Sequence, residues 1–291
     1  MTHELLPDIL ESPLFSIIFF PREDPYPEDV PEGARNILID VDGERIGARF
    51  YLKDKSLPTI LYFHGNGEIA RDYDDIFHLF WERGANLFVS DYRGYGLSTG
   101  RPTLKNIITD SHKVFERFKK VLEENSCSGG IFIMGRSLGS MPAIELAYHY
   151  GDEINGLIIE SGSAENFPRI ARYCGVRLEP ELEERLRSLS NVEKIKRIKT
   201  PLLVIHGEFD SIIPLEEGIK LYENSPAEKT LVVIPRADHN NLLWLGMDIY
   251  FSALEEFLSY NKGRRCYCLL YTSDAADEGL GVDLGGRRII K

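Results

Sequence analysis

Short apolar runs alternate with helical stretches along most of this 291-residue chain, and this alternation restricts the possible folds more than any other feature. Runs such as Ile131-Phe-Ile-Met134 and Leu202-Leu-Val-Ile205 are continuously apolar, which is typical of strands that are buried on both faces. Strands that alternate with helices form a largely parallel sheet covered by helices on both sides. The sequence therefore predicts an α/β fold with a mostly parallel central sheet.

The predicted elements follow this alternation. Strands are expected at 36–41, 45–52, 59–63, 86–90, 130–134, 156–159, 201–205 and 230–234, and helices at 70–83, 104–124, 137–150, 215–223 and 242–259. The first two strands are joined at Asp42-Gly43, a pair that favours a tight hairpin turn. Residues 166–196 interrupt the alternation, and we expect them to form a small lid inserted at the carboxyl edge of the sheet.

The last residues do not continue the pattern of the rest of the chain. The segments Cys268–Glu278 and Val282–Ile290 resemble the in-frame translation of a DNA sequencing adapter, which indicates a gene assembled from environmental (metagenomic) reads. Such segments are excluded from reasoning about the fold. We therefore expect residues 1–265 to form one domain and residues 266–291 to be a non-native tail.

Composition and charge exclude several classes of protein. A formal net charge of −12 disfavours binding to phosphate backbones, so no nucleic-acid partner is expected. No apolar run approaches the roughly 20 residues that a membrane span requires. The start of the chain lacks the basic region of a secretory signal, and its few cysteines form no disulfide framework. These features predict a cytoplasmic protein, and they carry no signal for an oligomeric state.

The segment Gly135-Arg136-Ser137-Leu138-Gly139 follows a predicted buried strand and opens a predicted helix. A sharp strand-to-helix turn strains the backbone of the central serine and exposes its hydroxyl, and the flanking glycines allow close backbone approach. Ser137 is therefore the candidate nucleophile. The same pattern recurs at 96–100, but no helix follows it directly, so we interpret Ser98 as a turn residue.

A serine hydroxyl needs a base to remove its proton, and in this fold the acid and then the histidine follow the serine along the chain. His239 lies in a loop after the last predicted strand and is the candidate base. Asp210 follows the strand at 201–205 and is the candidate acid that orients the histidine. Glu208, Asp238 and, at a greater distance, Glu160 are alternatives to Asp210.

The segment His64-Gly65-Asn66-Gly67 follows the strand at 59–63. Acyl transfer creates a negatively charged oxygen, and each preorganised N–H donor that binds it contributes about 3 kcal/mol. We expect these oxyanion donors to be the backbone N–H groups of Asn66 and Leu138. His64 is then interpreted as a residue that holds the loop.

Together these segments resemble the α/β-hydrolase superfamily, and in particular the bacterial serine hydrolases of the BEM46-like and depalmitoylase-like branch. The resemblance spans roughly residues 19–258 and also includes the segments Phe19-Phe-Pro21, Asp91–Ser98 and Asp238-His-Asn240. It implies the α/β-hydrolase fold, a Ser137–His239–Asp210 triad and the oxyanion donors Asn66 and Leu138. Asp238 departs from the glycine that many relatives carry, which puts the pH optimum in doubt rather than the chemistry.

These observations predict a carboxylesterase-like serine hydrolase that cleaves a small-molecule ester or thioester through an acyl-enzyme, without a metal or an organic cofactor. Acyl thioesterase or lysophospholipase, peptidase, and non-catalytic binding protein on a hydrolase scaffold are the alternatives. In the lid, Phe167 and Tyr173 are expected either to line an apolar acyl pocket or to pack within the lid core.

Overall fold

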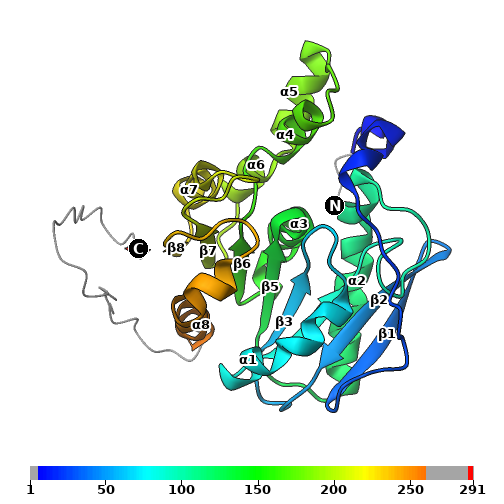
Figure 1. The fold of residues 1–291 in the computed structure, drawn as a ribbon, viewed down its shortest axis with the longest axis vertical. Coiled ribbons are helices and arrows are strands. Elements are labelled where there is room, and N and C mark those ends of the chain that lie inside the picture. Colours follow the sequence, from blue (N-terminus) through cyan, green and yellow to red (C-terminus); the bar gives the residue numbers. More distant parts are fainter. Residues whose placement is uncertain (1–5, 260–287, 291) are drawn as a thin grey trace.

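The computed structural model describes residues 6–259 and 288–290, and its centre is one sheet in the order β1-β2-β4-β3-β5-β6-β7-β8-β9 (Figure 1). Strand β1 pairs antiparallel with β2, and β2 pairs antiparallel with β4, while every later neighbour pair is parallel. The predicted α/β fold with a mostly parallel sheet is therefore confirmed. The strands are β1 (Ala34–Val41), β2 (Glu44–Tyr51), β3 (Thr59–Phe63), β4 (Asn86–Ser90), β5 (Ile131–Arg136), β6 (Gly156–Glu160), β7 (Leu202–Gly207), β8 (Lys229–Ile234) and β9 (Arg288–Ile290).

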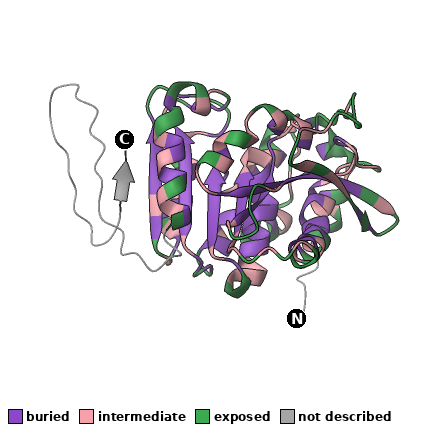
Figure 2. Ribbon diagram, turned by 90° about the horizontal axis from the view of Figure 1, so that it is seen from below, coloured by how far each residue is buried: buried purple, intermediate pink, exposed green. Residues whose placement is uncertain are grey.

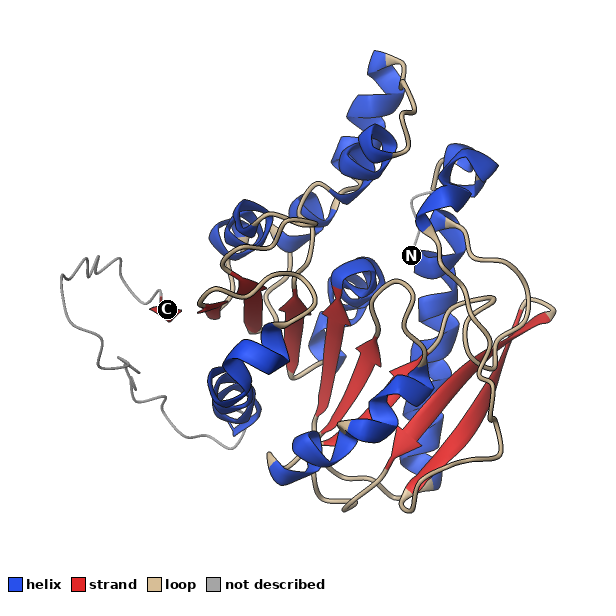
Figure 3. Ribbon diagram, in the orientation of Figure 1, coloured by secondary structure: helices blue, strands red, loops and turns tan. Residues whose placement is uncertain are grey.

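Helices cover both faces of the sheet (Figure 3). The α-helices are α1 (Phe77–Glu82), α2 (Leu104–Glu124), α3 (Ser140–Tyr150), α4 (Asn166–Tyr173), α5 (Pro180–Ser188), α6 (Asn191–Ile195), α7 (Leu215–Asn224) and α8 (Leu242–Ser259), and the 3-10 helices are η1 (Asp8–Glu11), η2 (Pro13–Ile18), η3 (Ala70–Asp75), η4 (Ser137–Gly139) and η5 (Gly151–Glu153). No helix among residues 6–259 is long and apolar enough to cross a bilayer.

Two hydrophobic cores lie on opposite faces of the sheet. Strand side chains alternate between them: Leu61 and Phe63 of β3 belong to the core under α2 and α3, whereas Ile60 and Tyr62 belong to the core under α1 and α8. This alternation is the period of two expected of a strand that is buried on both faces. Figure 2 shows that the central strands are buried along their length.

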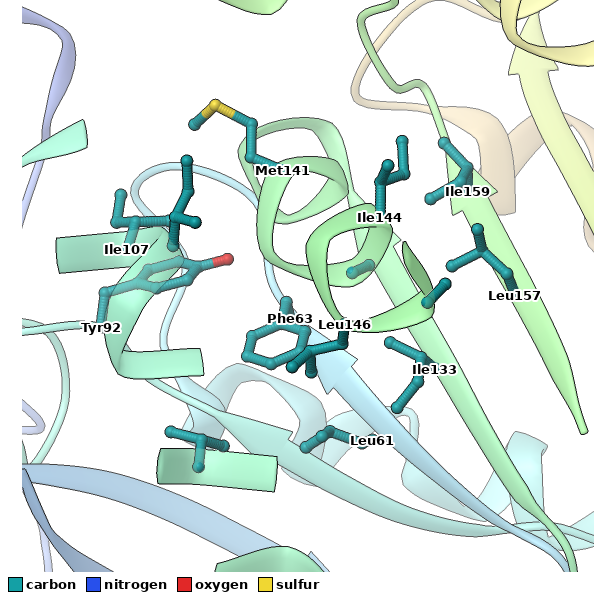
Figure 4. Close-up of a cluster of buried hydrophobic side chains, with 14 of the residues drawn as sticks. Leu61, Phe63, Tyr92, Ile107, Ile133, Met141, Ile144, Leu146, Leu157 and Ile159 are labelled. Carbon is teal, nitrogen blue, oxygen red and sulfur yellow. The ribbon is translucent and has the colours of Figure 1, made fainter. Parts of the chain in front are cut away.

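The first core holds α3 directly against the sheet. Figure 4 shows Ile144 and Leu146 of this helix beside Phe63, Ile133 and Leu157 of three neighbouring strands. Each of these side chains is at most 1% exposed, and burying one apolar side chain of this size contributes about 1.5–3 kcal/mol. The start of α3 is therefore firmly fixed at the end of β5, where the candidate nucleophile lies.

The hairpin between β1 and β2 turns at Asp42 and Gly43, as predicted. Both residues have positive φ, 48° and 86°, which is the conformation of the two-residue turn whose twist matches the flanking strands. The predicted helix at 70–83 is wrong as one element. Ile76, at φ −126° and ψ −7°, leaves helical geometry and separates η3 from α1.

The expected lid at 166–196 forms the helices α4, α5 and α6. Figure 1 shows α4 and α5 beyond the carboxyl ends of the parallel strands, and α4 contacts η2 from the start of the chain. Of the tail predicted at 266–291, only 288–290 lie within the described residues, where they pair in parallel with β8.

Candidate active site

Ser137 lies at the sharp turn between β5 and α3. Its φ of 52° is positive, a conformation that costs a residue other than glycine about 1–3 kcal/mol and that persists at functional sites. A Cβ atom at Gly139 would lie 2.0 Å from the carbonyl oxygen of Phe63, and one at Gly135 would lie 2.2 Å from the carbonyl oxygen of Gly139. Both glycines are therefore required by the close packing that holds the strained serine.

The structure brings Ser137, His239 and Asp210 into one hydrogen-bonded chain. Nδ1–H of His239 donates to Oδ2 of Asp210 at 2.7 Å, and Nε2 of His239 lies 2.9 Å from Oγ of Ser137. The carboxylate fixes the tautomer, so Nε2 is free to accept the serine proton. His239 and Asp210 are buried, whereas Ser137 is half-buried.

Asp210 is held as a charged carboxylate. Burial by itself raises the pKa of this carboxyl, but the hydrogen bond from His239 and the backbone N–H of Ile213 outweigh burial and lower the pKa below its ordinary value. Oδ1 accepts the N–H groups of Ile212 and Ile213 at 3.0 and 2.8 Å. Fixed donors of this kind favour the ionised form.

The alternative acids have other partners. Glu208 accepts the N–H of Arg236, and Asp238 accepts the N–H of Asn240, each at 2.9 Å. Glu160 accepts hydrogen bonds from the Arg136 guanidinium and from the hydroxyls of Tyr250 and Tyr62. Of the acids that the sequence left open, Asp210 is the one that bonds to His239.

A second histidine, His206, lies beside the carboxylate of Asp210. Sequence reasoning gave this histidine no role. Its Nε2–H donates to the carbonyl oxygen of Ile213 at 2.8 Å, and the same nitrogen lies 3.4 Å from Oδ2 of Asp210. Burial lowers the pKa of His206, so its ring is neutral and leaves Asp210 to pair with His239.

The two predicted oxyanion donors lie on the rim of the same pocket as Ser137. Leu138 follows Ser137 in the first helical turn, where backbone N–H groups have no acceptor within the helix. The side chain of Asn66 is fixed by three bonds: Oδ1 accepts the N–H of Phe20 and the hydroxyl of Tyr95, and Nδ2 donates to the carbonyl oxygen of Ile18.

His64 holds the loop that carries Asn66, as predicted. The ring is buried, and its Nδ1–H donates to the carbonyl oxygen of Gly65 at 2.8 Å. The hydroxyl of Tyr92 donates to the carbonyl oxygen of His64 at 2.7 Å. Ser98 closes a turn, as predicted: its N–H donates to the carbonyl oxygen of Tyr95 at 2.8 Å, and its Oγ accepts the N–H of Gly47 at 2.8 Å.

Arg136, immediately before Ser137, joins the serine turn to the histidine loop. Its Nη2 donates to the carbonyl oxygen of His239 at 2.9 Å and to Oδ1 of Asn240 at 3.1 Å. Its other nitrogens bind the carboxylates of Glu160 and Glu68. Sequence reasoning missed this role because the residue before the serine is treated as variable in the pattern.

Next to Ser137 and His239 is a pocket of about 800 Å³. Tyr173 lines it, but the structure does not bring Phe167 there; Phe167 is 1% exposed and packs in the core. The two residues are six positions apart on α4, which places their side chains about 120° apart around the helix. Phe167 therefore faces the core while Tyr173 faces the pocket.

Away from this site, three side chains bring potential metal ligands together. Atoms of His112, Glu145 and His149 lie within 4.8 Å of one another. The Nζ atom of Lys194 binds the other oxygen of the Glu145 carboxylate, so a fixed cation already neutralises this acid. The group is a partly buried polar network that links α3 to α2 and α6.

The chain resembles several known proteins in sequence. Residues 54–173 match the family described as serine aminopeptidase, S33. Protein bem46 of Schizosaccharomyces pombe is 30% identical over 260 residues, which cover 81% of this chain and 85% of bem46. The α/β-hydrolase domain-containing protein aho-3 of Caenorhabditis elegans is 29% identical over 208 residues, which cover 69% of this chain and 57% of aho-3.

Among solved structures, Est1E from Butyrivibrio proteoclasticus with bound ferulic acid has a TM-score of 0.66 at 21% identity, covering 78% of this chain and all of that chain. The Pyrococcus furiosus esterase Pf2001 has a TM-score of 0.63 at 22% identity, covering 78% of this chain and 92% of that chain. These likenesses define the fold as that of the α/β-hydrolases. The match to bem46 extends over most of both sequences, and the chain belongs to the bem46 family within the α/β-hydrolase superfamily.

Proposed function

We propose that this protein is a serine hydrolase that cleaves carboxylic esters through an acyl-enzyme. The observation that carries the proposal is the hydrogen-bonded chain from Oγ of Ser137 through His239 to Asp210, with distances of 2.9 and 2.7 Å. These distances lie within the reach required of a nucleophile, its base and the orienting acid. The strained backbone of Ser137 supports the same assignment.

The reaction proceeds in two halves. Oγ of Ser137 attacks the ester carbonyl carbon while Nε2 of His239 takes the hydroxyl proton, and the backbone N–H groups of Asn66 and Leu138 bind the resulting oxyanion. The C–O bond to the alcohol then breaks, and His239 returns its proton to the departing alcohol. In the second half water attacks the acyl-enzyme by the same route, which releases the acid and restores Ser137.

The first test labels the whole protein with a fluorophosphonate probe and maps the adduct by mass spectrometry. We expect an adduct on Ser137 that is lost in Ser137→Ala. Ser98→Ala is the matched control, since Ser98 occupies the same position in the second Gly-x-Ser-x-Gly pattern, and this variant should still be labelled. A folded wild-type protein with no adduct and no hydrolysis of p-nitrophenyl butyrate would overturn the proposal.

Thioester hydrolysis would use the same residues, because the attack on the carbonyl carbon is unchanged. A panel of matched p-nitrophenyl esters and thioesters, graded by acyl length, therefore follows the labelling experiment. Aminoacyl p-nitroanilides in the same panel test for peptidase activity. We expect a higher kcat/KM for the esters than for these amides.

A further inference from the structure

The pocket beside Ser137 has a charge opposite to that of the whole chain. The chain carries a formal net charge of −12, yet the residues that line the pocket within the described part of the chain include Arg136, Arg169 and Arg172 and no aspartate or glutamate. A cleft lined by one sign of charge attracts and orients ligands of the opposite sign. Two of these three arginines, Arg169 and Arg172, belong to α4.

The charge of Arg136 is neutralised inside the protein, because its guanidinium pairs with Glu68 and Glu160. Arg169 and Arg172 differ: in residues 6–259 neither makes an ion pair with a carboxylate. Arg169 instead donates to the carbonyl oxygen of Ile212, a bond that orients the guanidinium without neutralising it.

Glu165 lies just before α4, and the charge of Arg172 acts on its carboxylate. Its carboxylate is held by Lys220 and lies 3.7 Å from Arg187. The hydrogen bond from Lys220 is the main cause that lowers the pKa of Glu165, and the charges of Lys220, Arg187 and Arg172 act in the same direction. Glu165 is thus paired with Lys220, while Arg187 lies closer to Glu183, at 3.0 Å, and neither acid forms an ion pair with Arg169 or Arg172.

Helix geometry keeps the two arginines on the pocket side. Phe167 and Ala171 are buried and fix the opposite face of α4 in the core. Arg169 and Arg172 are three positions apart, so their side chains are neighbours on the helix surface. They therefore form a pair of planar cations suited to a carboxylate or a phosphate.

The rest of the lining is largely apolar. Ile18 and Phe20 come from the start of the chain, Met141 from α3, Ile170 from α4, and Ile212 and Ile213 from the loop after β7. A ligand that fills this pocket thus meets apolar walls and two guanidinium groups. The substrate that matches both features has an apolar part and an anionic part.

We propose that the pocket takes esters or thioesters that join an apolar acyl chain to an anionic group, a carboxylate or a phosphate, which Arg169 and Arg172 bind. The inference rests on the proposed function and specifies the substrate class of the same site. It also disfavours an aminopeptidase, because the substrate's ammonium group would meet two guanidinium groups and no carboxylate on the lining.

The test uses two pairs of substrates that differ in charge. Mono-p-nitrophenyl adipate carries a terminal carboxylate and is compared with p-nitrophenyl hexanoate. Butyryl-coenzyme A carries phosphates on the leaving group and is compared with the neutral S-butyryl-N-acetylcysteamine. For at least one pair we expect the anionic substrate to have a kcat/KM about tenfold or more above that of its neutral partner, mainly through KM. The pair that shows the preference identifies whether a carboxylate on the acyl chain or a phosphate on the leaving group is bound.

Arg169→Gln and Arg172→Gln should each reduce this preference, the ratio of the two kcat/KM values, by about tenfold, and the neutral substrate measured with the same variant corrects for any general effect on the site. Arg177→Gln is the matched control, because Arg177 is exposed in the same lid and does not line the pocket. Raising the salt concentration should weaken the preference of the wild type but should not change that of a protein carrying both Arg169→Gln and Arg172→Gln.

The outcomes separate the two proposals. No hydrolysis of any neutral substrate by the folded wild type, together with no label on Ser137, contradicts the proposed function. Hydrolysis of neutral substrates with no preference for either anionic partner overturns the inference alone. The inference is also overturned if Arg169→Gln and Arg172→Gln leave the preference unchanged, or if Arg177→Gln removes it equally. Faster cleavage of an aminoacyl p-nitroanilide than of the esters would indicate peptide substrates instead.

Discussion

Burial and hydrogen bonding shift the pKa of the Asp210 carboxyl in opposite directions. The side chain is inaccessible to solvent, and it accepts two backbone N–H groups in addition to Nδ1–H of His239. Because these donors outweigh burial and lower the pKa, the charged form is present above the ordinary pKa of about 3.9. The orienting contribution of this acid is therefore lost only as the pH falls through the lower pKa of the folded protein.

Asp210→Asn tests this role at the scale of one residue. We expect kcat for an ester to fall by about 10³- to 10⁴-fold, since an amide cannot fix the tautomer of His239 or stabilise its protonated form. KM should change little, because Asp210 does not line the pocket. Asp238→Asn is the matched control, and the assignment fails if this variant loses as much activity, as measured by steady-state kinetics.

Chain order and local context single out Ser137, Asp210 and His239 as candidates, because their positions after successive strands follow from the sequence, and the structure brings the three side chains within hydrogen-bonding distance. The same reasoning could not place Phe167 and Tyr173 on different faces of α4, since the start of that helix was not predicted. It also missed Arg136, whose partners Glu68 and His239 lie 68 and 103 positions away in the chain. Contacts over such separations carry no local signal.

At the scale of elements, β5 and the loop after β8 are coupled by Arg136. Its planar guanidinium reaches two carboxylates and the carbonyl oxygen of His239 at once. A lysine keeps the charge but has a single nitrogen, so it cannot maintain all of these bonds. The position of His239 relative to Ser137 therefore depends on an arginine that lies outside the hydrogen-bonded chain.

We expect Arg136→Lys to lower kcat by about 10- to 100-fold with a smaller change in KM, because a small displacement of the base weakens the attack. For Arg136→Met the free energy of unfolding should also fall by about 3–5 kcal/mol, since this variant leaves Glu68 and Glu160 without their cation. Kinetics and thermal unfolding separate the two effects. A folded Arg136→Lys protein with wild-type kcat would contradict the positioning role.

The boundaries of most elements could be predicted because apolar runs mark them. The strands at 59–63 and 86–90 and the helix at 104–124 agree with the structure, whereas the predicted helix at 242–259 is interrupted at Gly246, whose φ of −140° and ψ of 36° are not helical. Strands β5 and β7 each extend two residues beyond the prediction, through Gly135-Arg136 and His206-Gly207. Backbone pairing continues there after the apolar run has ended, so side-chain character alone places the end too early.

At the scale of the molecule, parallel strands bring distant parts of the sequence to one edge. Asn66, Ser137, Asp210 and His239 follow β3, β5, β7 and β8 in turn, and the carboxyl ends of these parallel strands lie side by side. The sheet therefore assembles the candidate site, and the lid helix α4 adds the charged wall of the pocket. Substrate preference and chemistry thus arise from different parts of the fold.

The ion pair between Glu145 and Lys194 connects this scaffold to the lid, and we expect it to control stability in acid. Both side chains are buried, and His112 and His149 also bind the carboxylate. Burial by itself raises the pKa of Glu145, but the charge of Lys194 and the hydrogen bonds from His112, His149 and Lys194 lower it well below its ordinary value. Glu145→Gln should lower the free energy of unfolding by about 3 kcal/mol at neutral pH, because it leaves Lys194 buried without a counter-charge.

The pH dependence follows from the direction of this shift. A depressed carboxyl pKa stabilises the folded state fully above the ordinary value of about 4.3, and the stabilisation is lost as the pH falls through the folded pKa. The difference in unfolding free energy between wild type and Glu145→Gln, measured in urea, should thus shrink as the pH falls below about pH 4. Glu153→Gln is the control, because Glu153 pairs with Lys119 at the surface, 47% exposed, and should cost less than about 1 kcal/mol. Equal effects of the two variants, or a difference that persists unchanged to pH 3, would show that the buried pair does not stabilise the contact between α3 and α6.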